Sequence, residues 1–145
     1  MNNSISQELN FFLLLAKTQS MLTRRFDNNL GGLGFNEFMI LFYLSQSKEE
    51  KMRRIDLAGK LGLTASGITR LLIPMEKIGW VKREPYTEDA RVSFVSLAKG
   101  GKNKLADESM EDAENLAKDL LPPATKTKDL ETFSLLLSTM SGTIG

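Results

Sequence analysis

One face of a predicted helix over residues 65–78 carries side chains that can hydrogen-bond to the edges of nucleic-acid bases. Ser66, Thr69, Arg70 and Lys77 recur at helical spacing along this face. A guanidinium matches the O6 and N7 acceptors of guanine, and a hydroxyl can donate to or accept from several base edges. Serine, threonine and arginine also populate any solvated helix face, so the stripe alone is equally compatible with a structural role.

The surroundings of this helix favour the nucleic-acid interpretation. Thr64 is a suitable N-cap, and Gly62 is placed to end a preceding helix over 55–61 in a left-handed C-cap. Two short helices joined by such a tight turn predict a helix-turn-helix, whose second helix enters the major groove with its N-terminal residues foremost. Thr64 and Ala65 therefore join the candidate DNA contacts. The opposite, core-facing side is predicted to consist of Ile68, Leu71, Leu72 and Met75.

The charge distribution points to the same region. The net charge is only +1, but residues 48–104 hold 13 Lys and Arg against 7 Asp and Glu, whereas residues 105–145 hold 3 against 8. A window of this size can fluctuate by several charges, so the excess supports the motif and does not replace it. Basic residues near the motif complete the set of expected DNA contacts: Arg53, Arg54, Lys82 and Arg83.

Composition argues against catalysis. The chain has no Cys and no His, which removes thiol nucleophiles, thiolate metal sites and the usual general base. The acidic residues of 107–114 spread along one helix flank and are expected to be solvated. We expect no enzymatic activity, no cofactor and no metal site. We also expect a cytoplasmic protein with no membrane partner, because the longest apolar runs fall short of the roughly 20 residues that span a bilayer and no signal peptide is evident.

The remaining elements predict a mainly α-helical fold with a small β wing. With 145 residues, the chain is expected to form one domain over 1–145. A winged helix-turn-helix lobe is expected at about 36–98, and dimerisation helices at about 5–34 and 99–145. Their apolar stripes are too long to hide on one small lobe, which predicts a homodimer. The expected elements are a helix over 5–29, a central helix capped by Asn36, a short strand or extended segment over 51–54, strands over 80–84 and 92–97, and helices over 99–121 and 126–141.

Three short motifs occur in the order and spacing of a known family. They are LAGKLGLTASGITRLL at 57–72, MEKIGWV at 75–81, and DAR at 89–91 followed by VSL at 95–97. On these residues the chain resembles the MarR family of bacterial transcription regulators. The resemblance implies a two-fold dimer that binds double-stranded DNA, with a recognition helix at about 65–78 and a wing at about 85–91. It also implies that Arg91, held by Asp89, enters the minor groove, and that a small anionic or phenolic effector releases DNA.

Several residues depart from the family pattern. Pro74 lies inside the recognition helix, where it removes a backbone hydrogen bond and predicts a bend. Ala98 replaces the usual threonine cap of the long helix, and Gly100 and Gly101 are expected to weaken its start. The absence of cysteine excludes sensing by thiol oxidation.

Two questions stay open at the level of sequence. A winged helix can also serve as a protein-interaction module with only non-specific DNA binding, which is the alternative to a repressor acting on a pseudo-palindromic operator. Trp80, Tyr43 and Tyr86 are candidate effector contacts, although an aromatic residue at the start of a strand is more often part of the core.

Overall fold

The first two helices follow from the apolar patterning of the N-terminal third. The computed structural model describes residues 4–85, 88–89 and 91–144. Helix α1 (Gln7–Asn29) is capped by Ser6, whose side chain accepts a hydrogen bond from the Leu9 amide at 3.1 Å. Helix α2 (Phe35–Ser45) is capped by Gly34, so the expected cap at Asn36 is wrong by two residues. Carboxylates do the capping instead: Glu37 accepts from the Gly34 amide and Asp27 from the Phe35 amide.

Helix α2 forms the centre of the core. Its Phe38, Ile40, Leu41 and Leu44 are buried, as expected for a helix that is apolar on most sides. It contacts α1 as well as several of the helices and strands that follow it. Several later elements of the fold therefore pack around this helix.

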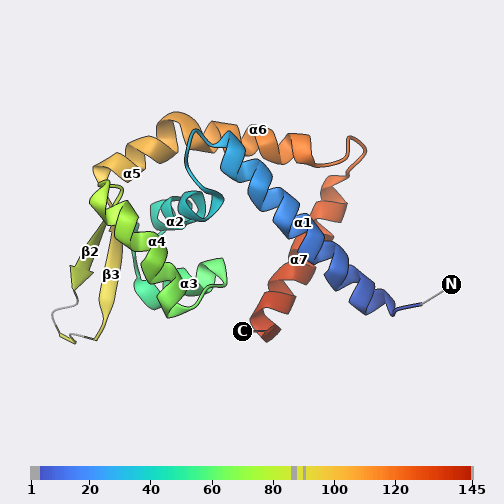
Figure 1. The fold of residues 1–145 in the computed structure, drawn as a ribbon, viewed down its shortest axis with the longest axis horizontal. Helices are drawn as coiled ribbons and strands as arrows, with labels where there is room; N and C mark the ends of the chain where they lie inside the picture. Colours follow the sequence, from blue (N-terminus) through green and yellow to red (C-terminus); the bar gives the residue numbers. More distant parts are fainter. Residues whose placement is uncertain (1–3, 86–87, 90, 145) are drawn as a thin grey trace.

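A small lobe follows, in which two consecutive helices lie in the chain between one short strand and a two-stranded hairpin (Figure 1). A 3₁₀ turn, η1 (Lys48–Glu50), leads into the short strand expected near residue 51. All pairings in the sheet are antiparallel, and the order is β1-β3-β2. The wing strands agree with expectation to within one residue. The elements are β1 (Lys51–Arg53), α3 (Arg54–Leu61), α4 (Ala65–Lys77), β2 (Val81–Pro85) and β3 (Ser93–Leu97).

The long acidic helix expected over 99–121 is divided into three segments. Helix α5 (Lys99–Lys104) passes into a π-helical segment, η2 (Leu105–Ser109), and then into α6 (Met110–Leu120). The patterning did not predict the π-helical segment. Ser109 is fully buried there and donates a hydrogen bond to the Lys104 carbonyl, five residues back, which matches the wider π turn.

The two glycines at the start of α5 lie close to the segment that follows α4. A Cβ atom on Gly100 would lie 2.7 Å from the Gly79 carbonyl oxygen, and Gly101 is buried against Trp80. Close packing therefore requires small residues here, which the sequence analysis did not anticipate, and the expected weakening of the helix start stays a prediction.

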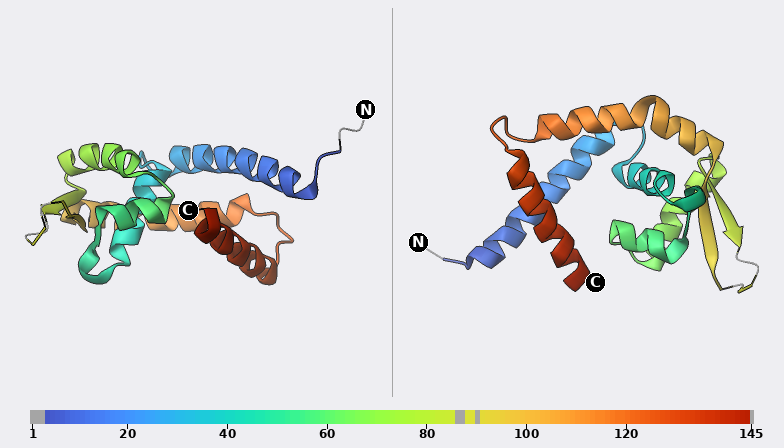
Figure 2. Two further views of the ribbon diagram at one scale, coloured as in Figure 1. Left: turned by 90° about the horizontal axis from the view of Figure 1, so that it is seen from below. Right: turned by 180° about the vertical axis from the view of Figure 1, so that it is seen from behind.

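The terminal helices extend away from the lobe. Helix α7 (Thr127–Ile144) crosses α1, which Figure 1 and the rear view of Figure 2 both show. No residue of α7 is buried, and in α1 only Phe26 is. No helix within the described part of the chain is long and apolar enough to cross a membrane.

Candidate nucleic-acid interface

The turn between α3 and α4 is set by local sequence. Gly62 ends α3 with φ 68°, a left-handed conformation that suits glycine. Thr64 then caps α4 by accepting a hydrogen bond from the Gly67 amide at 3.1 Å. Both features were expected, and they orient α4 against α3 as a helix-turn-helix.

Helix α4 separates a buried face from an exposed face. Ile68, Leu72 and Met75 are buried, and Leu71 is half-buried. The helix continues through Pro74 as one element, so the expected bend there stays a prediction. The exposed residues of α4 and its cap include five of the predicted contacts: Thr64, Ala65, Ser66, Arg70 and Lys77.

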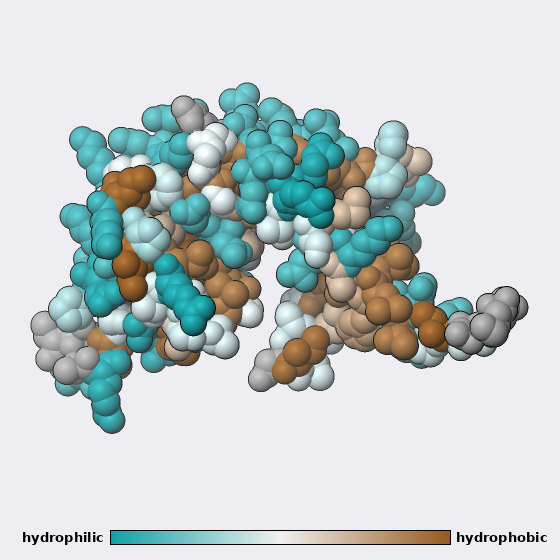
Figure 3. Space-filling view, in the orientation of Figure 1, coloured by the Kyte–Doolittle hydropathy of each residue, from teal (hydrophilic) through white to brown (hydrophobic). Residues whose placement is uncertain are grey.

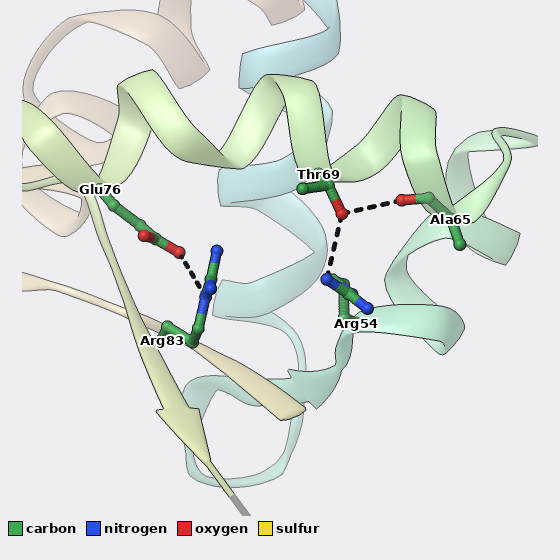
Figure 4. Close-up of polar contacts among 5 residues, drawn as sticks. All are labelled: Arg54, Ala65, Thr69, Glu76 and Arg83. Atoms are coloured by element: carbon green, nitrogen blue, oxygen red, sulfur yellow. Dashed lines mark hydrogen bonds and ion pairs between the residues drawn. The ribbon is translucent and has the colours of Figure 1, made fainter. Parts of the chain in front are cut away.

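Thr69 differs from the other members of the predicted stripe. It is half-buried, and its hydroxyl donates to the Ala65 carbonyl at 2.9 Å. The same oxygen accepts a hydrogen bond from Arg54 Nη1 at 3.1 Å (Figure 4). Helical spacing places Thr69 beside Ser66 and Arg70. The second partner of its hydroxyl, Arg54, comes from α3, and helical spacing within α4 does not predict it.

Arg53 immediately precedes α3 and pairs with Asp56. Its Nε lies 2.9 Å from Asp56 Oδ2 and its Nη2 lies 3.1 Å from Oδ1. This hydrogen bonding lowers the pKa of Asp56 and raises that of Arg53. The sequence analysis missed Asp56, although its i, i+3 spacing from Arg53 on a helix start is a signal that could have found it.

The two basic residues of β2 lie on opposite faces of the sheet. Arg83 Nε is 3.2 Å from Glu76 Oε1, so this arginine faces α4 (Figure 4). Side chains alternate along a strand, which directs the exposed Lys82 to the other face. Glu76 was also missed, because no local spacing connects it with Arg83.

In the described part of the wing, the carboxylate of Asp89 pairs with the guanidinium of Arg91. The Asp89 Oδ1 atom accepts from the Arg91 amide at 3.0 Å and from Arg91 Nε at 3.2 Å, while Nη2 donates to Oδ2 at 3.3 Å. These hydrogen bonds lower the Asp89 pKa. The Arg91 side chain remains 91% exposed, so Asp89 orients it without covering it. Residues 86, 87 and 90 of the expected wing lie outside the described residues, and Tyr86 is among them.

Four of the predicted contacts, one each from β1, α3, α4 and the wing, line one small cleft. Arg53, Arg54 and Arg91 surround a volume of about 100 Å³ together with Ala65 at the start of α4. Lys77 and Lys82 do not line it. The fold therefore brings the β1–α3 junction, the first turn of α4 and the wing to one basic surface.

A second, apolar groove lies on the other side of α2, between α1 and α6. Its volume is about 220 Å³, and Phe26, Phe35, Phe38 and Phe42 line it beside Met110 and Glu114. The rings of Phe26 and Phe35 stack with centroids 4.3 Å apart. Neither Trp80 nor Tyr43, two of the candidate effector contacts, lines this groove; both are half-buried against the core.

Residues 35–93 match the family model described as "MarR family". The transcriptional repressor YetL of Bacillus subtilis is 30% identical over 99 residues, which make up 67% of this chain and 59% of YetL. The chain thus spans less than two thirds of the length of this relative.

Solved structures share the fold over almost the entire chain. The transcriptional regulator BldR of Sulfolobus solfataricus is 26% identical with a TM-score of 0.76, covering 96% of this chain and 99% of BldR. Sco3205 of Streptomyces coelicolor, a MarR family regulator solved in complex with DNA, is 20% identical with a TM-score of 0.76, covering 97% and 90%. The family match across the winged-helix lobe, the identity with YetL and the likeness to BldR together show that the chain belongs to the MarR family.

Proposed function

We propose that this protein is a cytoplasmic, sequence-specific regulator of transcription that represses genes by binding double-stranded DNA as a homodimer. One observation carries the proposal: the exposed face of α4, with Ser66 and Arg70, is flanked by a wing whose Arg91 is oriented by Asp89 yet 91% exposed. A helix of this kind fits the major groove, and an oriented wing arginine fits the adjacent minor groove. On this proposal, the protein regulates transcription by binding DNA and catalyses no reaction.

The named relatives support this function. YetL is a transcriptional repressor, and Sco3205 and the MarR protein of Escherichia coli were solved with DNA. On this proposal, α4 presents Thr64, Ala65, Ser66 and Arg70 to the bases. The remaining contacts, Arg53, Arg54, Lys77, Lys82 and Arg83, would lie near backbone phosphates, which attract basic side chains whatever the sequence.

The homodimer is supported by apolar surface on the terminal helices. Phe12 and Leu13 of α1 are 44% and 55% exposed, and Phe133 and Leu136 of α7 are 56% and 44% exposed. Figure 3 shows apolar surface gathered over the arm that α1 and α7 form, away from the lobe. A monomer rarely leaves such a surface in water, and a second copy of the same two helices would cover it.

The apolar groove beside α2 is the proposed effector site. Its phenylalanine rings suit an aromatic ligand, and Glu114 is the ionisable residue in its lining. A carboxylate repels an anionic ligand and accepts a hydrogen bond from a phenol, so the lining favours a phenolic effector over an anionic one.

Selection from a pool of random duplexes tests the function. We expect enrichment of an inverted repeat with half-sites about 10 base pairs apart, because two recognition helices related by a two-fold axis must meet successive major grooves. Affinity for the enriched site should fall steeply as salt rises. Binding without enrichment of any sequence would instead favour a protein-interaction module with non-specific DNA binding.

A further inference from the structure

The cleft between α3, α4 and the wing concentrates positive charge. Arg53, Arg54 and Arg91 all line its volume of about 100 Å³, and the first residue of α4, Ala65, forms part of its wall. The partial positive charge at the start of a helix adds to that of the three guanidinium groups. The chemistry of this lining therefore favours a small oxyanion.

The three arginines differ in how their charge is balanced. Arg53 is engaged by both oxygens of Asp56, and Arg91 by both oxygens of Asp89. Among the described residues, no carboxylate lies within ion-pair distance of Arg54, whose hydrogen-bond partner is the Thr69 hydroxyl. Arg54 is thus the cation of the cleft whose charge the protein leaves uncompensated.

The bond from Arg54 to Thr69 also determines what Thr69 can do. The single hydroxyl proton of Thr69 is directed to the Ala65 carbonyl, and a lone pair of the same oxygen accepts from Arg54 (Figure 4). Thr69 has no further proton to donate to a base. Arg54 is half-buried, and its hydrogen bond to the described residues uses one nitrogen, Nη1, so that within this part of the chain Nε and Nη2 stay available for a ligand.

We propose that Arg54 binds one backbone phosphate of double-stranded DNA in this cleft, and that Thr69 is a positioning residue that orients Arg54 rather than a reader of bases. The proposal rests on the proposed DNA-binding function. A guanidinium held through one nitrogen can present its other N–H groups to two phosphate oxygens. The contact would position α4 in the groove without contributing sequence preference of its own.

Affinity measurements on the full chain, with an operator obtained by selection, test this role. Thr69→Val should weaken binding about 3- to 10-fold on every operator variant, because Arg54 loses its hydrogen-bond partner. Thr69→Ser keeps the hydroxyl and should restore wild-type affinity. Thr139→Val is the matched control, since Thr139 makes the same bond to the carbonyl four residues back, at 2.8 Å, with no arginine attached.

The role of Arg54 is tested by salt dependence. Arg54→Gln should reduce the slope of log affinity against log salt by about 0.9 for each cleft, and hence by about 1.8 for a dimer. In the Arg54→Gln background, Thr69→Val should have no further effect, because Thr69 acts through Arg54. Neutral methylphosphonates placed singly along the operator should identify one position per half-site where wild type loses affinity and Arg54→Gln does not.

Each outcome separates this inference from the proposed function. If the wild-type protein enriches no duplex, the proposed function fails. If wild type binds its operator but Thr69→Val changes preference at one base pair, Thr69 reads bases and the positioning role is overturned. An unchanged salt slope in Arg54→Gln, or a loss spread over all methylphosphonate positions, would overturn the phosphate contact.

Discussion

Gly101 of α5 packs directly against the backbone of Trp80, the residue that follows the turn at the end of α4. A Cβ atom on Gly101 would overlap the Trp80 carbonyl oxygen and lie 2.9 Å from Leu41 Cδ2. The same carbonyl accepts a hydrogen bond from the Ala98 amide at 3.0 Å. Helix α5 is therefore seated on the segment that directly follows α4.

Gly101→Ala should destabilise the protein. The added methyl group meets backbone as well as Leu41, so overpacking should cost about 1–3 kcal/mol in the free energy of unfolding, more than alanine gains in helix propensity. Urea unfolding measures the change. Gly59→Ala in α3 is the control: a Cβ atom there meets nothing within 4 Å, and this variant should be as stable as wild type or more stable. Equal stability of Gly101→Ala and wild type would contradict the close packing.

Arg70→Ala should relax sequence preference. Arg70 is exposed on α4. If this face enters the major groove as proposed, a bidentate contact to guanine contributes about 1–3 kcal/mol of discrimination against a wrong base. We therefore expect the variant to lose preference at one or two inner positions of each half-site, measured by titration of base-substituted operators. An even loss across all operators, with a smaller salt slope, would show that Arg70 contacts phosphate instead.

Arg91→Ala should weaken binding to operators with A·T-rich flanks. A narrow minor groove has enhanced negative potential, which attracts an inserted arginine. Competition between A·T-rich and G·C-rich flanks measures the effect, and the preference should shrink in the variant. Lys118→Gln, which removes an exposed charge from α6, is the control and should keep the preference. A flank preference that survives in Arg91→Ala would argue against minor-groove insertion.

DNA affinity at fixed ionic strength should be flat between about pH 5.5 and 7, because the chain has no histidine to titrate there. Hydrogen bonds from Arg53 and Arg91 lower the pKa of Asp56 and Asp89 from the ordinary value of 3.8. Because the pKa of each carboxyl group is lowered in the folded protein, each Asp–Arg pair contributes fully to stability above pH 3.8. The contribution is lost only as the pH falls through the lowered pKa. A transition in affinity near pH 6 would contradict this assignment.

Phe133→Glu should convert the proposed dimer into a monomer. Phe133 belongs to the apolar face of α7 and is 56% exposed in one copy, so a charge there opposes burial against a partner. Light scattering at micromolar concentration measures the mass. Leu135→Glu is the control and should remain a dimer. Leu135 lies two residues after Phe133, so its side chain points about 200° away around the helix. A wild-type protein that is a well-folded monomer would remove the basis for the dimer.

Local sequence determined the helix-turn-helix. Gly62 and Thr64 act on their own backbone or on a residue three positions away, and both their conformations and their hydrogen bonds agree with expectation. The buried face of α4 was predictable for the same reason, since helical periodicity places Ile68, Leu72 and Met75 on one side. The Asp89–Arg91 pair likewise spans only two residues and followed from the family resemblance.

Only the tertiary structure decided which polar groups are engaged by residues far away along the chain. Thr69 belongs to the polar stripe by its spacing, but Arg54, 15 residues earlier, reaches its hydroxyl because α3 packs on α4. Glu76 and Arg83 meet through the turn into β2, and Gly101 faces Trp80 across the fold. Capping and periodicity act within a few residues along the chain, whereas a hydrogen-bond partner or a steric limit depends on whichever segment arrives from elsewhere.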